Sequence, residues 1–285
     1  MKIQHLLPAA FAALFVVSCQ KEIDWGLGGG SASTRLVSIQ SKSGPADSTR
    51  VDYSYDASGR LIREKTTGVA AGNSADNDLL IYRNTAGIIT RTVQKSAALI
   101  QVGVDSLVTR YNYNSGTSRY TSSIFSTTVM GFTIMDSAVY TYDANGRISK
   151  DEHYLQTTGL PIPLPPILAL RNNYTYSANG AELKGISQEA PSTPGGPLAP
   201  VSAQAFTYDM KVNPLVILQE AILLNRPGLF SAGNMTNTIV TNTISPANSF
   251  TLDNTYIYNS QNKPDSSYST RNPGATITAS KYFYQ

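Results

Sequence analysis

Aromatic and polar positions alternate along most of this chain. At 53–55, 140–142 and 174–176, two tyrosines stand at i and i+2 around a Ser or Thr. Because successive side chains of a strand point to opposite faces, each pair places both rings on one face and the polar residue on the other. This alternation is typical of a half-buried antiparallel strand, so each pair predicts one.

A turn signal follows these pairs. Asp56-Ala57-Ser58-Gly59 and Asp143-Ala144-Asn145-Gly146 follow two of them directly, and Ser177-Ala178-Asn179-Gly180 follows the third. Asp favours the first position of a type I turn, and Gly favours the fourth, where φ can be positive. A type I turn closed by a Gly bulge connects β-hairpins, so Arg60-Leu61 and Arg147-Ile148 are expected to begin the return strands.

The pattern recurs through residues 35–285, with weaker copies at 81–87, 111–116, 206–209 and 256–259 and a truncated copy at 282–284. Most successive copies lie about 26 to 34 residues apart, and one gap, from Tyr208 to Tyr258, is about 50. A period in this range signals repeated supersecondary units. We expect an all-β body of consecutive antiparallel hairpins that form one large curled or barrel-like sheet, with Tyr and aliphatic side chains on its concave side.

Three segments interrupt the repeat. Thr157 to Leu170 is rich in proline, which rules out a central strand and predicts a loop over one end of the core, or else a lid or docking loop. Gln188 to Pro200 is expected to be a polar loop. Asn213-Pro214 fits an N-cap followed by Pro at the first helical position, so Leu215 to Leu224 is expected to form a short buried helix. This helix or the Pro-rich loop would cover the sheet.

The N-terminus has the layout of a secretory signal. Residues 1–18 carry Lys2 and then an apolar stretch too short to span a bilayer, and Ser18 precedes the chain's single cysteine, Cys19. This ending resembles the lipobox of bacterial lipoproteins, which implies cleavage before Cys19 and lipidation of that residue. Two or three acyl chains give a stable anchor.

The residues after Cys19 add two expectations. Gln20-Lys21-Glu22-Ile23-Asp24 resembles the surface-export signal of Bacteroidota lipoproteins, which implies an outer-membrane protein exposed on the cell surface. The Gly- and Ser-rich residues 26–34 have the composition of a flexible spacer. The chain thus divides into a signal peptide at 1–18, a lipidated tether and spacer at 19–34, and a repeat domain at 35–285.

The Tyr-Asp-x-x-Gly-Arg-Leu pattern resembles the YD repeat of RHS-type proteins. The lipobox, the expected strand openings at Asp47-Ser48, Asp105-Ser106 and Asp136-Ser137, and Asn213-Pro214 resemble more closely a family of Bacteroidota lipoproteins of unknown function built from such hairpins. Large RHS proteins form a closed shell from many more repeats, so a full toxin shell is not expected here. A transmembrane barrel is the competing architecture, and the lipid anchor, the prolines and the polar strand faces argue against it.

Composition narrows the chemistry. The chain has 285 residues, 41% hydrophobic and 14% charged, and its net charge of +3 has no basic cluster that would support nucleic-acid binding. A lipidated Cys19 leaves no thiol for a disulfide or a nucleophile. Of the two histidines, His5 leaves with the signal, so a zinc site of His and Cys ligands cannot form. We expect no metal and no other cofactor.

Few residues are candidates for catalysis. His153 would have to serve any Ser-His-Asp triad, and an ordinary half-exposed strand histidine is the favoured interpretation. Asp136, Asp151-Glu152 and Glu182 are the carboxylates that a glycosidase pair could draw on. Asp76-Asn77-Asp78 and the Asp143 turn lack the final Glu of an EF-hand loop, so they are not expected to bind calcium.

Three functions stay open at this point. The first is a non-enzymatic cell-envelope lipoprotein that binds or scaffolds, with a glycan, peptide or outer-membrane partner. The second is a carboxylate-dependent hydrolase acting on an extracellular polysaccharide, and the third is a purely structural envelope component. The Tyr pairs favour core packing over a glycan surface, because a residue repeated at every hairpin cannot by itself mark one site.

Overall fold

The computed structural model describes residues 35–129, 132–159, 165–218, 220–274 and 276–285. The signal peptide, Cys19 and the spacer lie outside the described residues. The strands are β1 (Leu36–Lys42), β2 (Ser48–Tyr55), β3 (Leu61–Ala70), β4 (Asn73–Ser74), β5 (Asn77–Arg83), β6 (Ile89–Ser96), β7 (Leu107–Asn114), β8 (Arg119–Val129), β9 (Phe132–Tyr142), β10 (Ile148–Thr158), β11 (Ile167–Tyr176), β12 (Leu183–Pro191), β13 (Leu198–Tyr208), β14 (Met235–Asn242), β15 (Phe250–Tyr258), β16 (Pro264–Asn272) and β17 (Thr276–Tyr284). The helices are α2 (Ala97–Gln101), α3 (Glu220–Leu223) and the 3-10 helices η3 (Pro227–Phe230) and η4 (Pro246–Asn248).

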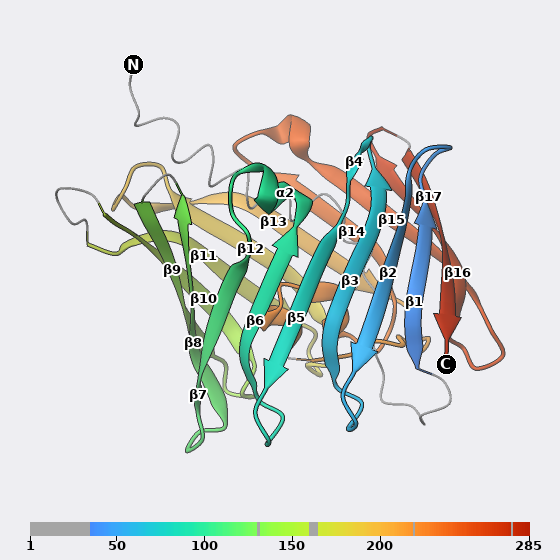
Figure 1. The fold of residues 1–285 in the computed structure, drawn as a ribbon, viewed down its shortest axis with the longest axis horizontal. Helices are drawn as coiled ribbons and strands as arrows, with labels where there is room; N and C mark the ends of the chain where they lie inside the picture. Colours follow the sequence, from blue (N-terminus) through green and yellow to red (C-terminus); the bar gives the residue numbers. More distant parts are fainter. Residues whose placement is uncertain (1–34, 130–131, 160–164, 219, 275) are drawn as a thin grey trace.

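The strands form a closed antiparallel barrel, which confirms the expected all-β hairpin sheet (Figure 1). Each strand pairs with the next along the chain, and the two-residue β4 is a side branch that pairs with β3, so sixteen strands form the wall. Closure comes from β1 and β17, which pair from Leu36↔Tyr284 to Lys42↔Ala279. The barrel therefore has no free sheet edge where its first and last strands meet.

The paired tyrosines face the barrel interior, as the i, i+2 spacing predicts. Tyr53 and Tyr282 are buried in the core, and most of the other paired tyrosines pack against it half-buried. The aliphatic core lies at the end of the barrel that carries the Asp-x-x-Gly turns, where Leu61, Ile148 and Leu183 begin return strands and are almost fully buried. Strand alternation thus puts rings and aliphatic side chains inside and most charges outside.

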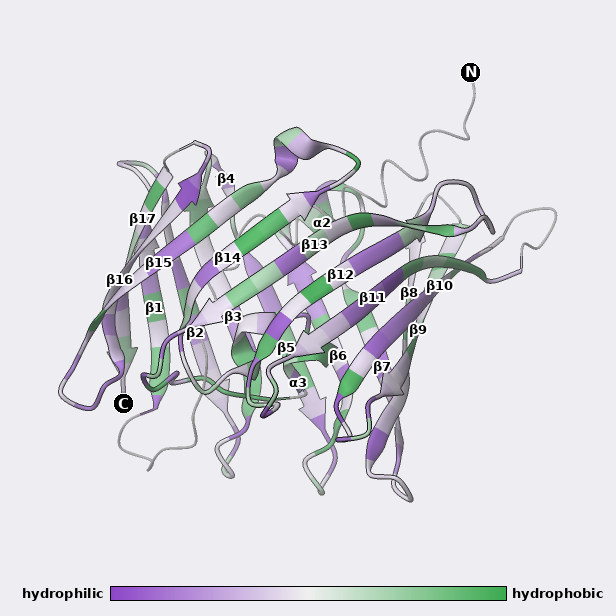
Figure 2. Cartoon of the chain, turned by 180° about the vertical axis from the view of Figure 1, so that it is seen from behind, coloured by the Kyte–Doolittle hydropathy of each residue, from purple (hydrophilic) through white to green (hydrophobic). Residues whose placement is uncertain are grey.

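The segment between β13 and β14 folds into the barrel and contacts opposite walls (Figures 1 and 2). Glu220 of α3 pairs with Arg83 of β5, and the Leu223 carbonyl accepts a hydrogen bond of 3.0 Å from Tyr111 of β7. Phe230 of η3 lies 5.1 Å, centroid to centroid, from the Tyr176 ring of β11. We call residues 209–234 the plug, because they fill one end of the interior.

Four local predictions need correction. The expected helix over Leu215–Leu224 is only α3, Glu220–Leu223, and Asn213 does not cap it: the buried Asn213 amide donates to the Ser231 carbonyl at 2.8 Å. A chain that must cross the barrel's interior is better satisfied by short turns than by one straight helix. Gln188–Pro200 is mostly strand, because β12 extends to Pro191 and β13 begins at Leu198.

The other two corrections concern strand ends. β10 extends to Thr158 and β11 begins at Ile167, so both ends of the predicted Pro-rich loop lie in strands, and residues 160–164 lie outside the described residues. Asp136-Ser137 lies inside β9 and does not open it. Long strands extend through these segments because their backbone groups still find a ladder partner, in β9 for Gln156–Thr158 and in β13 for Ala190 and Pro191.

Candidate functional site

The Asp of an intact turn is held by the backbone and by the Arg that follows it. Asp56 Oδ1 accepts hydrogen bonds of 2.9 Å from the Ser58 and Arg60 amides, and Oδ2 accepts one of 2.8 Å from Arg60 Nε. Asp143 repeats this arrangement with Arg147. The Arg60 amide and guanidinium hold the pKa of the Asp56 carboxyl below its usual range. These carboxylates are turn acceptors, which confirms a hairpin turn at Asp143.

The basic residue after one turn packs on the next hairpin. The Arg147 guanidinium carbon lies 4.6 Å from the Tyr176 ring centroid, and Lys184 Nζ lies 5.7 Å from that of Tyr208. A Cβ added to Gly180 would lie 2.1 Å from Arg147 Nη1. The basic residue therefore makes a cation–π contact with a Tyr of the next hairpin. At Gly180 the absence of a side chain leaves the space that Arg147 occupies.

Most hydroxyls of the paired tyrosines at this end of the barrel donate hydrogen bonds to the backbone. The second Tyr of several pairs donates to a carbonyl near the start of an earlier strand: Tyr55 to Leu36, Tyr142 to Tyr120, Tyr176 to Ile148, Tyr208 to Leu183 and Tyr284 to Pro264. Burial raises the pKa of four of these hydroxyls, those of Tyr55, Tyr142, Tyr176 and Tyr284. The repeated tyrosines are structural, as expected, and none of these five is singled out by its contacts.

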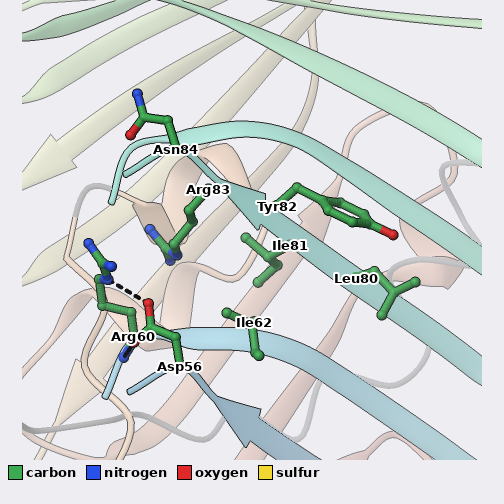
Figure 3. Close-up of a pocket in the computed structure, with 8 residues that line it drawn as sticks. All are labelled: Asp56, Arg60, Ile62, Leu80, Ile81, Tyr82, Arg83 and Asn84. Carbon is green, nitrogen blue, oxygen red and sulfur yellow. Dashed lines mark hydrogen bonds and ion pairs between the residues drawn. The ribbon is translucent and has the colours of Figure 1, made fainter. Parts of the chain in front are cut away.

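A shallow dent of about 340 Å³ lies on the wall beside the first intact turn (Figure 3). Its lining includes Asp56, Arg60, Ile62 and Tyr82, and the Asp56–Arg60 ion pair closes one side. Its charged groups are already paired, Asp56 with Arg60 and Arg83 with Glu220 of the plug, so this shallow pocket offers little new chemistry.

The inner wall of β9 to β13 carries a connected polar network around His153. His153 Nδ1 lies 2.9 Å from Asp136 Oδ2, and Nε2 lies 3.2 Å from Asp151 Oδ1. Asp151 also accepts from Asn172 at 2.7 Å and from the Tyr174 hydroxyl at 2.6 Å. Both carboxylates are buried, so the imidazole lies between two shielded negative charges.

These charges fix the protonation state of His153. Burial alone lowers the pKa of the imidazole, but the hydrogen bonds to Asp136 and Asp151 outweigh it and raise the pKa to about 10. Burial beside Asp151 also raises the pKa of Tyr174. At neutral pH His153 is an imidazolium and cannot accept a proton, so it cannot act as a general base there.

The structure brings two of the four candidate carboxylates together and separates the others. Asp136 and Asp151 face the same imidazole, whose ring occupies the space between them. Glu152 points to the outer face, where Arg171 donates to it at 2.7 Å, and Glu182 pairs with Lys184 at 2.6 Å. Sequence reasoning placed His153 in a strand correctly but missed its two partners.

The register of the hairpin could have found this cluster. With β9 and β10 joined by the Asp143 turn, the strand pairing places His153 opposite Ala138, two positions from Asp136 and on the same face. In the stretch Asp76-Asn77-Asp78, which was not expected to bind calcium, Asp78 forms an ion pair of 2.6 Å with Arg63 on the outer wall. Among the described residues, no three His, Cys, Asp or Glu side chains gather where they could hold a metal ion.

The strand pairing between β14 and β15 is short beside the plug. β14 pairs with β15 only from Asn237↔Asp253 to Val240↔Phe250, although β15 continues to Tyr258. A cavity of about 560 Å³ lies beyond that point, lined by Tyr208, Asp209, Lys211, Asn254, Tyr256 and Tyr258 among others. We call it the seam cavity. The sequence signal for it is the 50-residue gap in the repeat, but the gap alone does not show a cavity.

Asp209 organises this cavity. Its carboxylate accepts a 2.9 Å hydrogen bond from the Lys211 amide, two from the backbone and side-chain amides of Asn234, and one from the Tyr258 hydroxyl. Burial and the Asp209 carboxylate raise the pKa of Tyr258. Lys211 Nζ lies 2.9 Å from Asn262 Oδ1 and 5.8 Å from the Tyr258 ring centroid. The seam cavity thus combines aromatic faces with polar groups held in place.

Comparison with known proteins shows the fold. No protein-family model matches the chain, and no curated protein matches it. A porin-like protein from Bacteroides vulgatus ATCC 8482 is 11% identical, with a TM-score of 0.51 and coverage of 88% of this chain and 99% of that chain. A porin-like protein from Bacteroides uniformis ATCC 8492 is 13% identical, with a TM-score of 0.49 and coverage of 89% and 99%.

A chain of the Photorhabdus luminescens Tc holotoxin pore is 14% identical and is matched over 78% of this chain and 12% of that chain. Its TM-score of 0.28 carries no argument about a toxin shell. Among the described residues, no helix is long and apolar enough to cross a membrane. At 11% identity the likeness to the Bacteroides vulgatus protein shows a shared barrel fold and nothing of function.

Proposed function

We propose that the chain is a cell-envelope lipoprotein whose barrel stands in water and binds or scaffolds without catalysis. An acylated Cys19 would hold it to the outer membrane, and Glu22 and Asp24 would direct it to the cell surface. The spacer at 26–34 would let the barrel stand off the bilayer.

One observation carries this proposal: ion pairs lie on opposite sides of the outer wall. Arg63 of β3 pairs with Asp78 of β5, and Arg50 pairs with Asp52 along β2 at 2.7 Å. On the opposite wall Arg171 of β11 joins Glu152 of β10. An Arg or Lys facing lipid near the bilayer midplane costs about 2–4 kcal/mol, so a wall with these residues is suited to water.

The plug favours a binding protein over a channel. Its Glu220 carboxylate makes two hydrogen bonds, of 2.6 and 2.7 Å, to the buried guanidinium of Arg83, and Arg226 reaches Glu64 of β3 at 3.1 Å. Ties to β3 and β5, together with the Phe230 contact to β11, fix the plug across the interior. A solute crossing the barrel would have to displace these buried pairs.

The inner polar network favours binding over hydrolysis. A glycosidase needs two carboxylates that flank the scissile bond. Asp136 and Asp151 instead flank the His153 ring, and Asp151 is further held by Asn172 and Tyr174. A sugar could reach between the two carboxylates only by displacing the imidazolium.

Metabolic labelling tests the anchor. Cells that express the full chain are fed an alkyne fatty acid, and the purified protein is examined for the tag. We expect the wild-type chain and a Ser18→Ala control to carry it and Cys19→Ala to lose it. A tag that persists in Cys19→Ala contradicts the anchor.

Protease treatment of intact cells tests exposure. We expect the wild-type barrel to be cleaved at the surface while a periplasmic marker stays intact. If Glu22→Lys/Asp24→Lys leaves surface cleavage unchanged, the export role of these two residues is wrong. A wild-type barrel that is protected until the cells are lysed contradicts surface exposure.

A further inference from the structure

We propose that the seam cavity binds a neutral saccharide of one or two sugar rings. This deepens the binding function proposed above and rests on it, because it names the ligand class and the place. The occupant would enter through the barrel wall between β14 and β15, and not through an end of the barrel.

The strand pairing is short here because the repeat is broken. In the other hairpins a short turn returns the chain beside the strand it left, but here the plug intervenes and β14 begins at Met235. Beyond Asp253, β15 keeps its pairing with β16 but has no ladder to β14. The cavity is consequently lined both by the inward-facing Tyr256 and by the outward-facing, exposed Thr255. The β12–β13 and β10–β11 ladders stop three residues before the ends of β13 and β11, whereas the β14–β15 ladder stops five residues before the end of β15, so more of β15 lacks a partner here.

The lining has the mixed character that a saccharide requires. Tyr208, Tyr256 and Tyr258 contribute aromatic surface, and the Tyr256 and Tyr258 rings lie 6.0 Å apart at 31°. Aromatic rings pack on the apolar C–H faces of sugars, and amide, amine and hydroxyl groups bond to the hydroxyls. Lys211 and the exposed Thr255 supply such groups beside the rings.

Charge favours a neutral ligand. The cavity holds one acid, Asp209, and one base, Lys211, among its lining residues. The Asp209 carboxylate is already bonded to Asn234, Tyr258 and the Lys211 amide, so it is neither a free nucleophile nor an open cation site. The volume of about 560 Å³ lies within the range of small-molecule sites.

An added peptide strand is disfavoured by the groups that cross the opening. The Met235 carbonyl at the start of β14 accepts 3.0 Å hydrogen bonds from Asn254 Nδ2 and from the Tyr256 hydroxyl. Strand addition needs free backbone groups along an edge. Here β15 side chains occupy that carbonyl, so the opening is suited to a compact ligand.

The experiment uses the full-length chain in a detergent without sugar headgroups. Maltose, cellobiose, lactose and N,N′-diacetylchitobiose are titrated, with saturation-transfer NMR to detect contact and calorimetry to measure Kd. Thr255→Trp blocks the mouth of the cavity. Val139→Trp is the matched control, because Val139 also points outward directly before a Tyr-x-Tyr pair, but on the intact β9–β10 ladder.

We expect at least one disaccharide to bind and Thr255→Trp to weaken it by about tenfold or more, while Val139→Trp leaves Kd unchanged. The proposal is overturned if no disaccharide binds with Kd below about 10 mM, or if Thr255→Trp has no more effect than Val139→Trp. It is also overturned if an extended pentapeptide binds in place of the sugars and Thr255→Trp blocks it. A failure here leaves the lipid tag and surface cleavage unaffected, so it can be told apart from a failure of the proposed function.

Discussion

The Arg60 guanidinium occupies the space above Gly87, the glycine of the next turn along the chain: a Cβ added to Gly87 would lie 1.4 Å from Arg60 Nη1. Gly87 has a φ of +85°, in the left-handed region that favours glycine. Glycine is therefore required at position 87 for two reasons: the backbone has a positive φ, and the Arg60 side chain approaches too closely to leave room for a Cβ.

Gly87→Ala should destabilise the barrel more than Gly72→Ala. Gly72 has a φ of +74° but open space around its Cβ position, so its substitution measures backbone strain alone, about 1–2 kcal/mol. Gly87→Ala must also displace the partly exposed Arg60, which adds about 0.5–1 kcal/mol. Urea unfolding measures both free energies. If the difference persists when Arg60 is changed to Ala, the Arg60 contact is not its cause.

Glu220→Gln should cost about 2–3 kcal/mol of unfolding free energy, since it leaves the Arg83 guanidinium, 5% exposed, without its carboxylate. The matched control is Glu182→Gln, whose Lys184 partner is well exposed, and it should cost less than about 1 kcal/mol. Equal costs in urea unfolding would contradict a plug held by a buried pair. Arg83→Met combined with Glu220→Gln should recover part of the loss.

Tyr176→Phe should cost about 1 kcal/mol, because it removes the hydroxyl that satisfies the Ile148 carbonyl. Tyr154→Phe, on β10 outside the repeat, should change stability by less than about 0.5 kcal/mol. Thermal and urea unfolding measure both. A neutral Tyr176→Phe would show that the ring, and not the hydroxyl, is what the repeat requires.

Stability should fall as the pH rises above neutrality. The pKa of His153 is raised to about 10 in the folded chain, whereas an unfolded histidine titrates near 6.5, so the folded state holds the proton more tightly. The contribution is fully present below about pH 6.5 and is lost as pH rises through about 10, with a slope near 1.4 kcal/mol per pH unit between them.

Urea unfolding at pH 6, 7.5 and 9 measures this slope. His153→Gln should be less stable at pH 6 and should lack the decline. A wild-type free energy that is flat over this range, or that declines equally in His153→Gln, would show that Asp136 and Asp151 do not hold the proton on His153.

The hairpins were predictable because their determinants are local. Asp56, Gly59 and the tyrosines before them lie within a few residues of one another, and the turn and strand rules act over that distance. Barrel closure was left open as curled or closed because β1 and β17 pair across the whole chain, as at Leu36↔Tyr284. His153 was placed in a strand, but its pairing with Asp136 depends on the register between two strands.

The plug and the seam cavity were least predictable. Leu215–Leu224 is apolar nearly all round, which favours a long helix by composition. Only the four residues of α3 are helical in the structure. The seam cavity depends on where β14 begins after the plug, and no residue near Met235 marks that point. Both features follow from tertiary packing, which the sequence pattern does not encode.

The central claim is that the outer wall of this barrel lies in water. Val139→Cys and the inward-facing Ala138→Cys are spin-labelled in the full chain reconstituted in vesicles, where an acylated Cys19 does not react. Collision rates with a water-soluble nickel complex and with oxygen are then compared. The account predicts that the label at 139 collides readily with nickel and the label at 138 with neither reagent. A label at 139 that collides with oxygen and not with nickel would place the wall in lipid and contradict it.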